Sequence, residues 1–384
     1  MMIRYATASS GIAACAALVL ASGVLMLPSY AQDATGTVIT DSKAIEDSLS
    51  KEAFPSWLDE LKKEVLRKGI KLSTWQAVEP YLIVNQEVLT LDQQQPEFTQ
   101  TFWTYLDKRM TEIRIQTGKI QFGSLVLSGE KHPRRSSFFR KELIAAITII
   151  DQGHTTPDDM KGSWAGAVGQ MQFMPSIFLR YAQDADGDKK INLWNSTEDA
   201  LTSAAVFLQS VGWQAGVAWG QEVTLPKKFD YALADGQTPR TIPELEALGI
   251  KPTIKLWRNP QQEVLIWTPA GHTGPAFVTY SNFQIIKKWN RSNHYAFTVG
   301  LMADRMVNNY RLSIATPDNI KPWPKDFTRQ LQQRLLDLGY DIGKVDGWLG
   351  QNTIRAIRSF QQEKGLIADG YPDADTLKHL QLSD

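Results

Sequence analysis

One stretch of fifteen residues, from 162 to 176, limits what this chain can fold into more than any other segment. It reads Gly-Ser-Trp-Ala-Gly-Ala-Val-Gly-Gln-Met-Gln-Phe-Met-Pro-Ser. Glycines let the backbone bend and come close to a ligand, and Ser163 and Gln172 offer hydroxyl and amide groups for hydrogen bonds. Pro175 suits the first turn of a new helix. This composition predicts a groove wall and a poor core segment. The alternative is an irregular turn between two helices.

Apolar residues recur at helical spacing on both sides of this stretch. The stripes are Trp57, Leu61 and Val65, then Phe139, Leu143, Ile147 and Ile150, then Leu201, Ala204, Ala205, Leu208 and Val211. Gly69, Gly153 and Gly212 follow the three stripes and are expected to end helices. The segment Ser73-Thr74-Trp75-Gln76 reads as a capping box that begins a short helix. The stripes predict a core of packed helices.

The character of the chain changes between residues 221 and 280. Three short runs there have strand propensity and are separated by Pro, Gly and Asn: Val223-Thr224-Leu225, Val264-Leu265-Ile266-Trp267 and Phe277-Val278-Thr279-Tyr280. Helical periodicity then resumes from Tyr295 to Met306. A small β element inserted in a mainly helical domain fits this order.

Residues 316 to 324 contain three prolines and are typical of a linker. Beyond them lie three short helical patterns, formed by Leu331, Leu335, Leu336 and Leu338, by Ile354, Ile357 and Phe360, and by Asp375, Leu377 and Leu380. Gly339 and Gly365 are expected to end the first two helices. This part predicts a small three-helix bundle.

The stretch from 162 to 176 resembles the signature of the B-type lytic murein transglycosylases, enzymes that cut the glycan strands of bacterial peptidoglycan. Further segments match in order and in approximate spacing: Arg134-Arg135, Asp184 to Asp188, Trp194, Asp199-Ala200-Leu201, Gly212-Trp213 and Trp289 to Ala296. The resemblance covers most of residues 51 to 312. It implies a mainly α, lysozyme-like helical domain with a small β insertion.

The C-terminal part resembles a second family, the type 1 peptidoglycan-binding domain. The matching motifs are Leu338-Gly339-Tyr340, Val345-Asp346-Gly347-Trp348-Leu349-Gly350, Thr353, Phe360-Gln361 and Asp369-Gly370. They span nearly all of residues 326 to 382. This match is independent of the first and names the same polymer as the partner.

The chain begins with a pattern typical of a secretory signal. Arg4 precedes an apolar stretch, and Ser29-Tyr30-Ala31 offers a small-x-small cleavage site. A membrane anchor is the alternative. We expect a signal peptide over 1–31, a linker over 32–50, a lytic transglycosylase-like domain over 51–315, a linker over 316–325 and a peptidoglycan-binding domain over 326–384. The cleaved protein is expected to be periplasmic and monomeric, without a stable membrane span.

Charge and cysteine content narrow the classes of partner. Lys and Arg number 41, Asp and Glu also number 41, and this balance excludes an electrostatic footprint for nucleic acid. The single cysteine is Cys15, within the predicted signal, so the mature chain has no disulfide. Stability is expected to come from packing.

The resemblance to lytic transglycosylases implies a lyase mechanism that needs one carboxyl group. A buried glutamic acid protonates the oxygen between N-acetylmuramic acid and N-acetylglucosamine. The same carboxylate then deprotonates the muramic acid 6-hydroxyl, which attacks its own anomeric carbon and gives a 1,6-anhydro product. By position, Ser163, Gln172, Asn290 and Tyr295 would bind acetamido and hydroxyl groups of the glycan. Each of them would alternatively make a local hydrogen bond or cap a helix.

The chain departs from the family at the catalytic glutamate. The family carries it in a Glu-Ser/Thr-x-Phe-Gly motif before the paired arginines, but here Lys119 stands three residues before Phe122-Gly123. Glycines at 118, 123 and 129 leave little room for a helix there, and we interpret the family's glutamate-bearing segment as missing. Glu130 is expected to be solvated, and Glu142 to pair with an arginine or a backbone amide. We therefore assign no catalytic residue. Two functions stay open: a lytic transglycosylase with a rearranged active site, and a catalytically inactive peptidoglycan-binding protein.

Three alternating carboxylates, Asp184, Asp186 and Asp188, resemble the start of an EF-hand-like calcium loop, which the family contains. Lys189 stands where an EF-hand has its turn glycine, and Asn195 stands at the twelfth position. The resemblance implies a structural calcium ion, and the alternative is a solvated acidic turn. The reaction is expected to require no cofactor.

Overall fold

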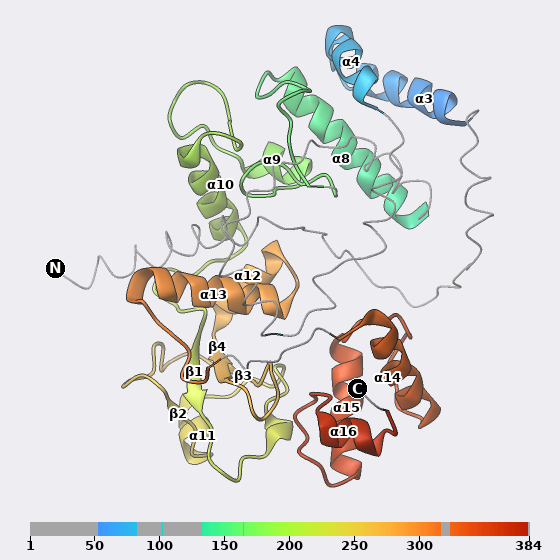
Figure 1. Ribbon diagram of the computed structural model, residues 1–384. Coiled ribbons are helices and arrows are strands. Elements are labelled where there is room, and N and C mark those ends of the chain that lie inside the picture. Colours follow the sequence, from blue (N-terminus) through green and yellow to red (C-terminus); the bar gives the residue numbers. More distant parts are fainter. Residues whose placement is uncertain (1–52, 83–101, 103–132, 164, 316–322, 383–384) are drawn as a thin grey trace, which may run out of the picture. The chain divides into compact units, whose positions relative to one another are not determined.

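The computed structural model describes residues 53–82, 102, 133–163, 165–315 and 323–382 (Figure 1). These residues form two compact units: an N-terminal unit up to Phe207, and a C-terminal unit made of Phe102 and the chain from Leu208 onwards. The predicted signal peptide over 1–31, the linker over 32–50 and the segment around Lys119 lie outside the described residues. The described part of the chain contains no helix long and apolar enough to cross a bilayer.

The N-terminal unit is built from helices. They are α3 (Ala53–Arg67), α4 (Leu72–Val78), the 3-10 turn η1 (Glu79–Tyr81), α8 (Pro133–Asp151), α9 (Pro175–Tyr181) and α10 (Thr197–Ser210). The predicted stripes supply its core, since Leu61, Val65, Leu143 and Ile147 are fully buried. Left-handed backbone at Gly69 and Gly153, with φ of 86° and 80°, ends α3 and α8 as predicted.

The predicted capping box at the start of α4 is wrong. The helix begins two residues earlier, after Lys71, and no side chain of its own segment caps it. Thr74 Oγ1 instead donates a hydrogen bond of 2.6 Å to Asp151 Oδ1, which also accepts one of 3.0 Å from the Lys71 amide. The carboxylate at the end of α8 therefore caps α4, a contact between residues 77 to 80 positions apart.

A four-stranded antiparallel sheet forms the centre of the C-terminal unit. Its strand order is β2-β1-β4-β3, with bounds Lys251–Pro252, Gly220–Thr224, Ala276–Thr279 and Leu265–Trp267. The 3-10 turn η3 (Tyr231–Leu233) and the helix α11 (Ile242–Ala247) lie between β1 and β2 in sequence. Strands β1, β3 and β4 occupy the three predicted runs.

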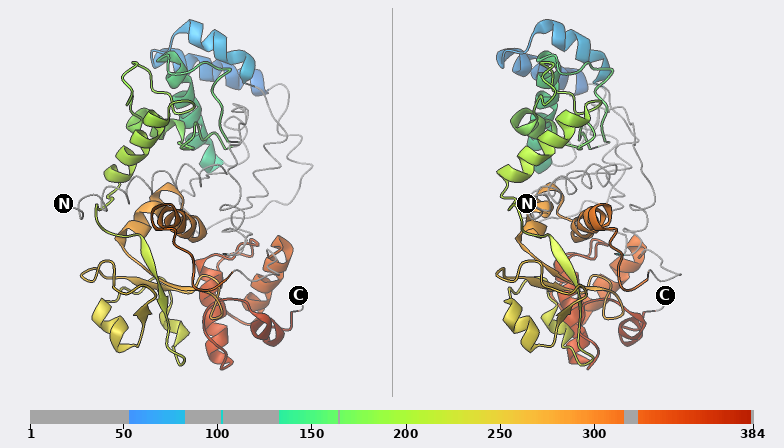
Figure 2. Two further views of the ribbon diagram at one scale, coloured as in Figure 1. Left: turned by 60° about the vertical axis from the view of Figure 1, so that its left-hand side comes forward. Right: turned by 90° about the vertical axis from the view of Figure 1, so that its left-hand side faces the viewer.

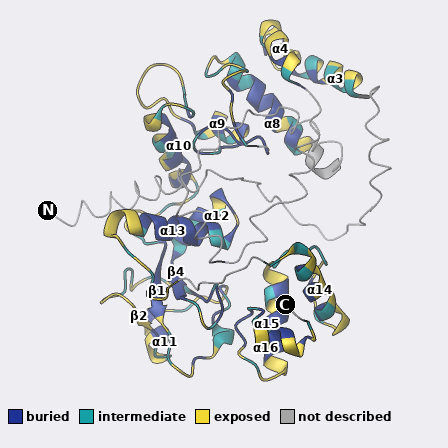
Figure 3. Cartoon of the chain, viewed as in Figure 1, coloured by how far each residue is buried: buried dark blue, intermediate teal, exposed yellow. Residues whose placement is uncertain are grey.

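Helices α12 (Ser281–Trp289) and α13 (Asn293–Asn308) pack on this sheet (Figure 2). Phe297 of α13 contacts Phe277 of β4 and Trp267 of β3, with ring centroids 5.0 and 5.9 Å apart. A side chain at Gly300 would collide with the Trp219 ring, since its Cβ would lie 2.2 Å from that ring. Residues 295 to 303 of α13 are all buried, as Figure 3 shows.

The C-terminal bundle consists of α14 (Lys325–Asp337), α15 (Gln351–Glu363) and α16 (Ala374–His379), as predicted. Its core contains eight buried apolar residues: Leu331, Leu335, Ile342, Ala356, Ile357, Phe360, Leu377 and Leu380. Each half of the bundle also contains one buried glutamine whose side chain makes several hydrogen bonds, and we call each such set a hub. Gln332 joins α14 to the Asp346-Gly347 turn, and Gln361 joins α15 to the Asp369-Gly370 turn.

Candidate functional site

The glycine-rich stretch folds as a compact series of turns in the N-terminal unit. Ser163 Oγ accepts a hydrogen bond of 3.1 Å from the Ala167 amide, and the Ser163 amide donates one of 2.8 Å to the Ala167 carbonyl. Gln172 lies in the left-handed region, with φ of 51°, and its Nε2 donates to the Gly169 carbonyl at 3.0 Å. Ser163 and Gln172 are both partly exposed and close in the chain.

The apolar residues of the same stretch are buried, so the prediction of a poor core segment is wrong for them. Ala167, Val168 and Met171 are fully buried, and Phe173 is 3% exposed. The small and apolar side chains of the stretch face the core, while Ser163 and Gln172 stay partly exposed. One segment therefore supplies both core and surface.

The stretch is held against the following loop by backbone contacts. The Gln170 amide donates to the Leu193 carbonyl at 2.8 Å, and Gln170 Nε2 donates to the Trp194 carbonyl at 3.2 Å. A Cβ at Gly169 would lie 2.7 Å from the Leu193 carbonyl oxygen. Gly169 has a φ of 67°, so both the backbone conformation and the close approach require glycine.

Glu142 of α8 is 3% exposed and holds the first turn of α9. Its two carboxylate oxygens accept hydrogen bonds from the Ser176 hydroxyl at 2.6 Å and the Ser176 amide at 2.9 Å. Burial raises the pKa of the Glu142 carboxyl, while the two hydrogen bonds from Ser176 act in the opposite direction. The expected partner of Glu142, a backbone amide, is thus present. Pro175 begins α9 as predicted.

Asn290 and Tyr295 belong to the C-terminal unit, in the connection between α12 and α13. Asn290 Oδ1 accepts a hydrogen bond of 2.9 Å from the Ser292 amide, and Ser292 Oγ accepts one of 3.3 Å from the Tyr295 amide. Ser292 is the N-cap of α13. Asn290 is 7% and Tyr295 1% exposed, so this motif builds a buried corner and a helix start. The candidate residues thus form two pairs, one in each unit.

The three aspartates of the predicted calcium loop come together. Asp184, Asp186 and Asp188 are exposed, and one oxygen from each lies within 4.8 Å of the others. Asp184 also accepts hydrogen bonds from the Gly187 and Lys189 amides, at 2.7 and 2.9 Å. Lys189 takes the left-handed conformation, with φ of 70°, at the position where an EF-hand has glycine. The oxygen set and the tight turn fit a hard cation.

Asp199, which follows the acidic loop in the sequence, organises this loop. The side chain is fully buried, and its two oxygens accept hydrogen bonds of 2.7 Å from the Ala185 and Asn192 amides. It therefore ties the two ends of the acidic loop to the start of α10. An aspartate in the first turn of an apolar helical stripe, shortly after an acidic turn, is the signal that points to such a role.

The geometry defines a class of protein: a mainly helical domain with a small sheet, followed by a three-helix bundle. The family described as Transglycosylase SLT domain matches residues 53–124 and 121–304, and the peptidoglycan binding domain family matches residues 325–380. The chain therefore belongs to the B-type lytic transglycosylases and carries a C-terminal peptidoglycan-binding domain. This confirms the predicted families.

Solved structures and curated proteins agree with this assignment. The crystal structure of SltB3 from Pseudomonas aeruginosa in complex with NAG-anhNAM-pentapeptide is 33% identical, has a TM-score of 0.76, and is matched over 85% of this chain and 99% of that one. The predicted lysozyme-like fold class is confirmed. Membrane-bound lytic murein transglycosylase B of Escherichia coli is 36% identical over 173 residues, which are 44% of this chain and 45% of that protein. The match thus spans less than half the length of this relative.

A second curated relative matches a shorter part of the chain. N-acetylmuramoyl-L-alanine amidase CwlM of Mycobacterium tuberculosis is 47% identical over 55 residues, 14% of each chain. The family match over residues 325–380 includes both glutamine hubs of the bundle.

Proposed function

We propose that this chain is an exported peptidoglycan lytic transglycosylase, which cleaves the bond between N-acetylmuramic acid and N-acetylglucosamine and releases a 1,6-anhydro product. The observation that carries the proposal is the pairing of two family matches in one chain. The transglycosylase family covers residues 53–304 in two pieces, and a wall-binding domain family covers residues 325–380. The protein would act in the periplasm as a monomer and bind peptidoglycan glycan strands.

The residues of the glycine-rich stretch would contact the glycan. Ser163 and Gln172 are partly exposed and lie on a rigid turn, which suits hydrogen bonds to acetamido and hydroxyl groups. Asn290 and Tyr295 are buried, so they would act by holding the α12–α13 corner in place. Intramolecular attack by the 6-hydroxyl has a high effective molarity and requires no second carboxylate.

The acid and base of this reaction stay unassigned. Glu142 is buried and has a raised pKa, as a general acid requires, but both of its oxygens are engaged by Ser176. We expect Glu142 to be structural. Glu142→Gln keeps the shape and one acceptor, so product formation should survive this substitution. Loss of product in a folded Glu142→Gln variant would instead assign the proton transfer to Glu142.

The deciding experiment incubates the purified mature protein with peptidoglycan sacculi and measures 1,6-anhydromuropeptides by mass spectrometry. Their appearance is the expected result. A Gln172→Ala variant should lower the yield, whereas Gln209→Ala, at an exposed position of α10, serves as the matched control. Sacculus binding without any anhydro product would overturn the proposal.

A second candidate is a catalytically inactive peptidoglycan-binding protein. The observation that favours it is the sequence around Lys119, where the family's glutamate motif is missing. The transglycosylase family also matches in two pieces that meet at residues 121–124, close to this position. The same sacculus experiment separates the candidates, because the second predicts binding and no cleavage.

We also propose that Asp184, Asp186 and Asp188 hold a structural calcium ion. Three carboxylates this close repel one another, and a divalent cation would relieve the repulsion. Calcium should raise the melting temperature of the protein more than magnesium does. Asp186→Asn should remove most of this shift, and an unchanged melting temperature on adding calcium would contradict the site.

A further inference from the structure

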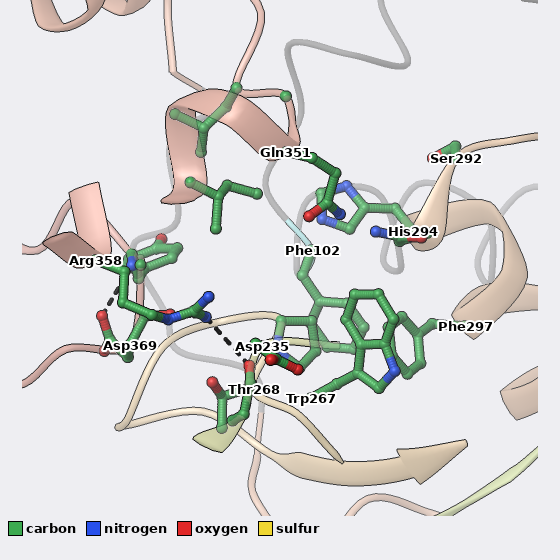
Figure 4. A pocket seen from close by; sticks show the side chains of 18 of the residues that line it. Phe102, Asp235, Trp267, Thr268, Ser292, His294, Phe297, Gln351, Arg358 and Asp369 are labelled. Atoms are coloured by element: carbon green, nitrogen blue, oxygen red, sulfur yellow. Dashed lines mark hydrogen bonds between the residues drawn. The ribbon is translucent and has the colours of Figure 1, made fainter. Parts of the chain in front are cut away.

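A cavity of about 290 Å³ lies between the C-terminal bundle and the rest of the C-terminal unit (Figure 4). One wall comes from β3, the start of α13 and Phe102, and the other from α15 and the Asp369-Gly370 turn. Aromatic and aliphatic side chains cover much of it, including Trp267, Phe297 and Tyr371. Its volume lies just below the usual range for small-ligand sites, which begins at about 300 Å³.

The two walls are held together by specific polar contacts. Asp369, whose side chain is fully buried, accepts hydrogen bonds of 2.8 Å from both the backbone amide and Nδ1 of His272. Arg358 of α15 donates to the Ala234 carbonyl at 3.1 Å. Gly271 permits the close approach, since a Cβ there would lie 2.9 Å from the Tyr371 Cβ. Specific contacts between the bundle and the rest of the C-terminal unit therefore define the cavity.

Two buried polar atoms in the cavity wall have no partner within the described residues. Thr268 is 9% exposed, and neither its Oγ1 nor the buried Oδ1 of Asn293 has a hydrogen-bond partner there. Both residues line the cavity, together with Arg358 and Gln351. Unsatisfied buried polar groups are costly, so they call for a hydrogen-bonding occupant.

Two helices also begin at this cavity. The N-cap and first residue of α13 are Ser292 and Asn293, those of α15 are Gly350 and Gln351, and all four line it. Gly350 caps α15 without a side-chain hydrogen bond, so the first amides of that helix have no cap. Helix N-termini favour a carboxylate or another anion.

The formal charges of the lining residues cancel. Arg291 and Arg358 are matched by Asp235 and Asp369, and burial lowers the pKa of His294 to about 4, which keeps it neutral at neutral pH. Both aspartates accept hydrogen bonds from neighbouring groups: Asp235 from the Thr238 hydroxyl and two amides, Asp369 from His272 and Gln361. A ligand with charges of both signs suits such a lining better than a purely anionic one.

We propose that this cavity binds a short zwitterionic peptide with small aliphatic side chains, of the class found in peptidoglycan stems. A carboxylate of the peptide lies at the two helix N-termini near Arg358, its amides bond to Thr268 and Asn293, and its methyl groups contact the aromatic wall. The proposed function enters this proposal at one point: it makes peptidoglycan the natural source of the peptide. Aromatic walls also stack on sugars, which makes an oligosaccharide the competing occupant.

The test titrates the full chain with the free pentapeptide L-Ala-γ-D-Glu-L-Lys-D-Ala-D-Ala and, separately, with chitotetraose by isothermal calorimetry. We expect saturable binding of the pentapeptide and none of the sugar at this cavity. Thr268→Val keeps the side-chain volume but removes the hydroxyl, so the pentapeptide should bind about three- to tenfold more weakly. Thr298→Val is the matched control, because Thr298 is also buried with an unpartnered hydroxyl and lies outside the cavity lining.

A second pair of variants tests the contact between His272 and Asp369, which holds the two walls of the cavity together. His272→Ala removes the Nδ1 contact to Asp369 and should weaken binding more than Thr268→Val does. His379→Ala is its control, since that exposed side chain bonds only to the Asp375 carbonyl of its own helix within the described residues. Binding of chitotetraose in place of the pentapeptide, or pentapeptide binding that neither Thr268→Val nor His272→Ala changes, would overturn the proposal. Peptide binding that persists in a protein unable to cleave sacculi would refute the proposed function alone.

Discussion

The two halves of the C-terminal bundle contain the same hydrogen-bond hub in different surroundings. In the first half, Gln332 Nε2 donates to Asp346 Oδ1, the Trp348 carbonyl and Thr353 Oγ1, while its Oε1 accepts from the Gly347 amide. In the second half, Gln361 repeats all four bonds with Asp369, the Tyr371 carbonyl, Thr376 and the Gly370 amide. The two turns share one internal design.

The halves differ at the second oxygen of each aspartate. Asp369 Oδ2 accepts two hydrogen bonds from His272, outside the bundle. Asp346 Oδ2 accepts none from the described residues, and Lys325 lies nearby with its Nζ 4.4 Å from the centroid of the Trp348 ring. The comparison teaches that the same hub stabilises the fold of both halves of the bundle. Only the second half also uses its aspartate to bind a residue outside the bundle, because His272 lies next to it.

Removing either hub should have the largest effect. Gln332→Leu and Gln361→Leu each leave a buried threonine hydroxyl, a glycine amide and an aspartate short of partners, which should destabilise the bundle by about 3 kcal/mol or more. Denaturant unfolding followed by tryptophan fluorescence measures this loss. Gln333→Leu is the control, because Gln333 is exposed and bonds only to Asp337 within the described residues. A loss at one hub and not at the other would break the equivalence of the two halves.

Substituting the aspartates should sharpen the difference between them. Asn retains the Oδ1 acceptor of each hub, but at position 369 its amide would face the His272 amide as donor against donor. Asp369→Asn should therefore cost about 2 kcal/mol more than Asp346→Asn, as expected for two lost charge-assisted bonds. The same unfolding experiment on both variants checks this prediction. Equal losses would show that the His272 contact contributes no stability.

The smallest expected effect concerns Tyr340, which follows α14 in the first half of the bundle. Tyr340 donates a hydrogen bond to Glu363 of α15, and burial together with this carboxylate raises the pKa of Tyr340 to about 12. A raised pKa means that the contribution is complete below the unfolded pKa of about 10 and is lost as pH rises through about 12. Tyr340→Phe should cost under about 1 kcal/mol at neutral pH.

Alkaline unfolding of the wild type and Tyr340→Phe tests this assignment. The difference in stability between the two proteins should shrink as pH rises from about 10 to about 12, because the tyrosinate can no longer donate. Phenolate absorbance followed in the same titration reports the ionisation directly. A constant difference across this range would show that the Glu363 contact does not set the ionisation of Tyr340.

Local sequence was sufficient for the elements whose cause is local. Helical stripes placed α3, α8, α10, α14 and α15, and left-handed glycines ended α3 and α8 where they were predicted to. The error at α4 has the opposite cause. Ser73 and Thr74 have the composition of a cap, but the cap of α4 is Asp151, far away in the chain.

The site shows the same division. Glycine turns and alternating carboxylates are local patterns, and they made Ser163, Gln172 and the three aspartates of the acidic loop candidates from the sequence. The local pattern did not show which amides Asp199 binds or that Glu142 holds Ser176. Those partners lie 7 to 34 residues apart and meet only when helices pack.

The sequence by itself determined the families, the mainly helical fold and the small sheet, because these follow from periodicity and motif composition. Only the tertiary structure decided which oxygen of which aspartate docks the bundle, which threonine is left unpaired and where a cavity remains. The physical reason is that a polar atom's role depends on the neighbours that packing brings within hydrogen-bond distance, and short motifs carry no record of those neighbours.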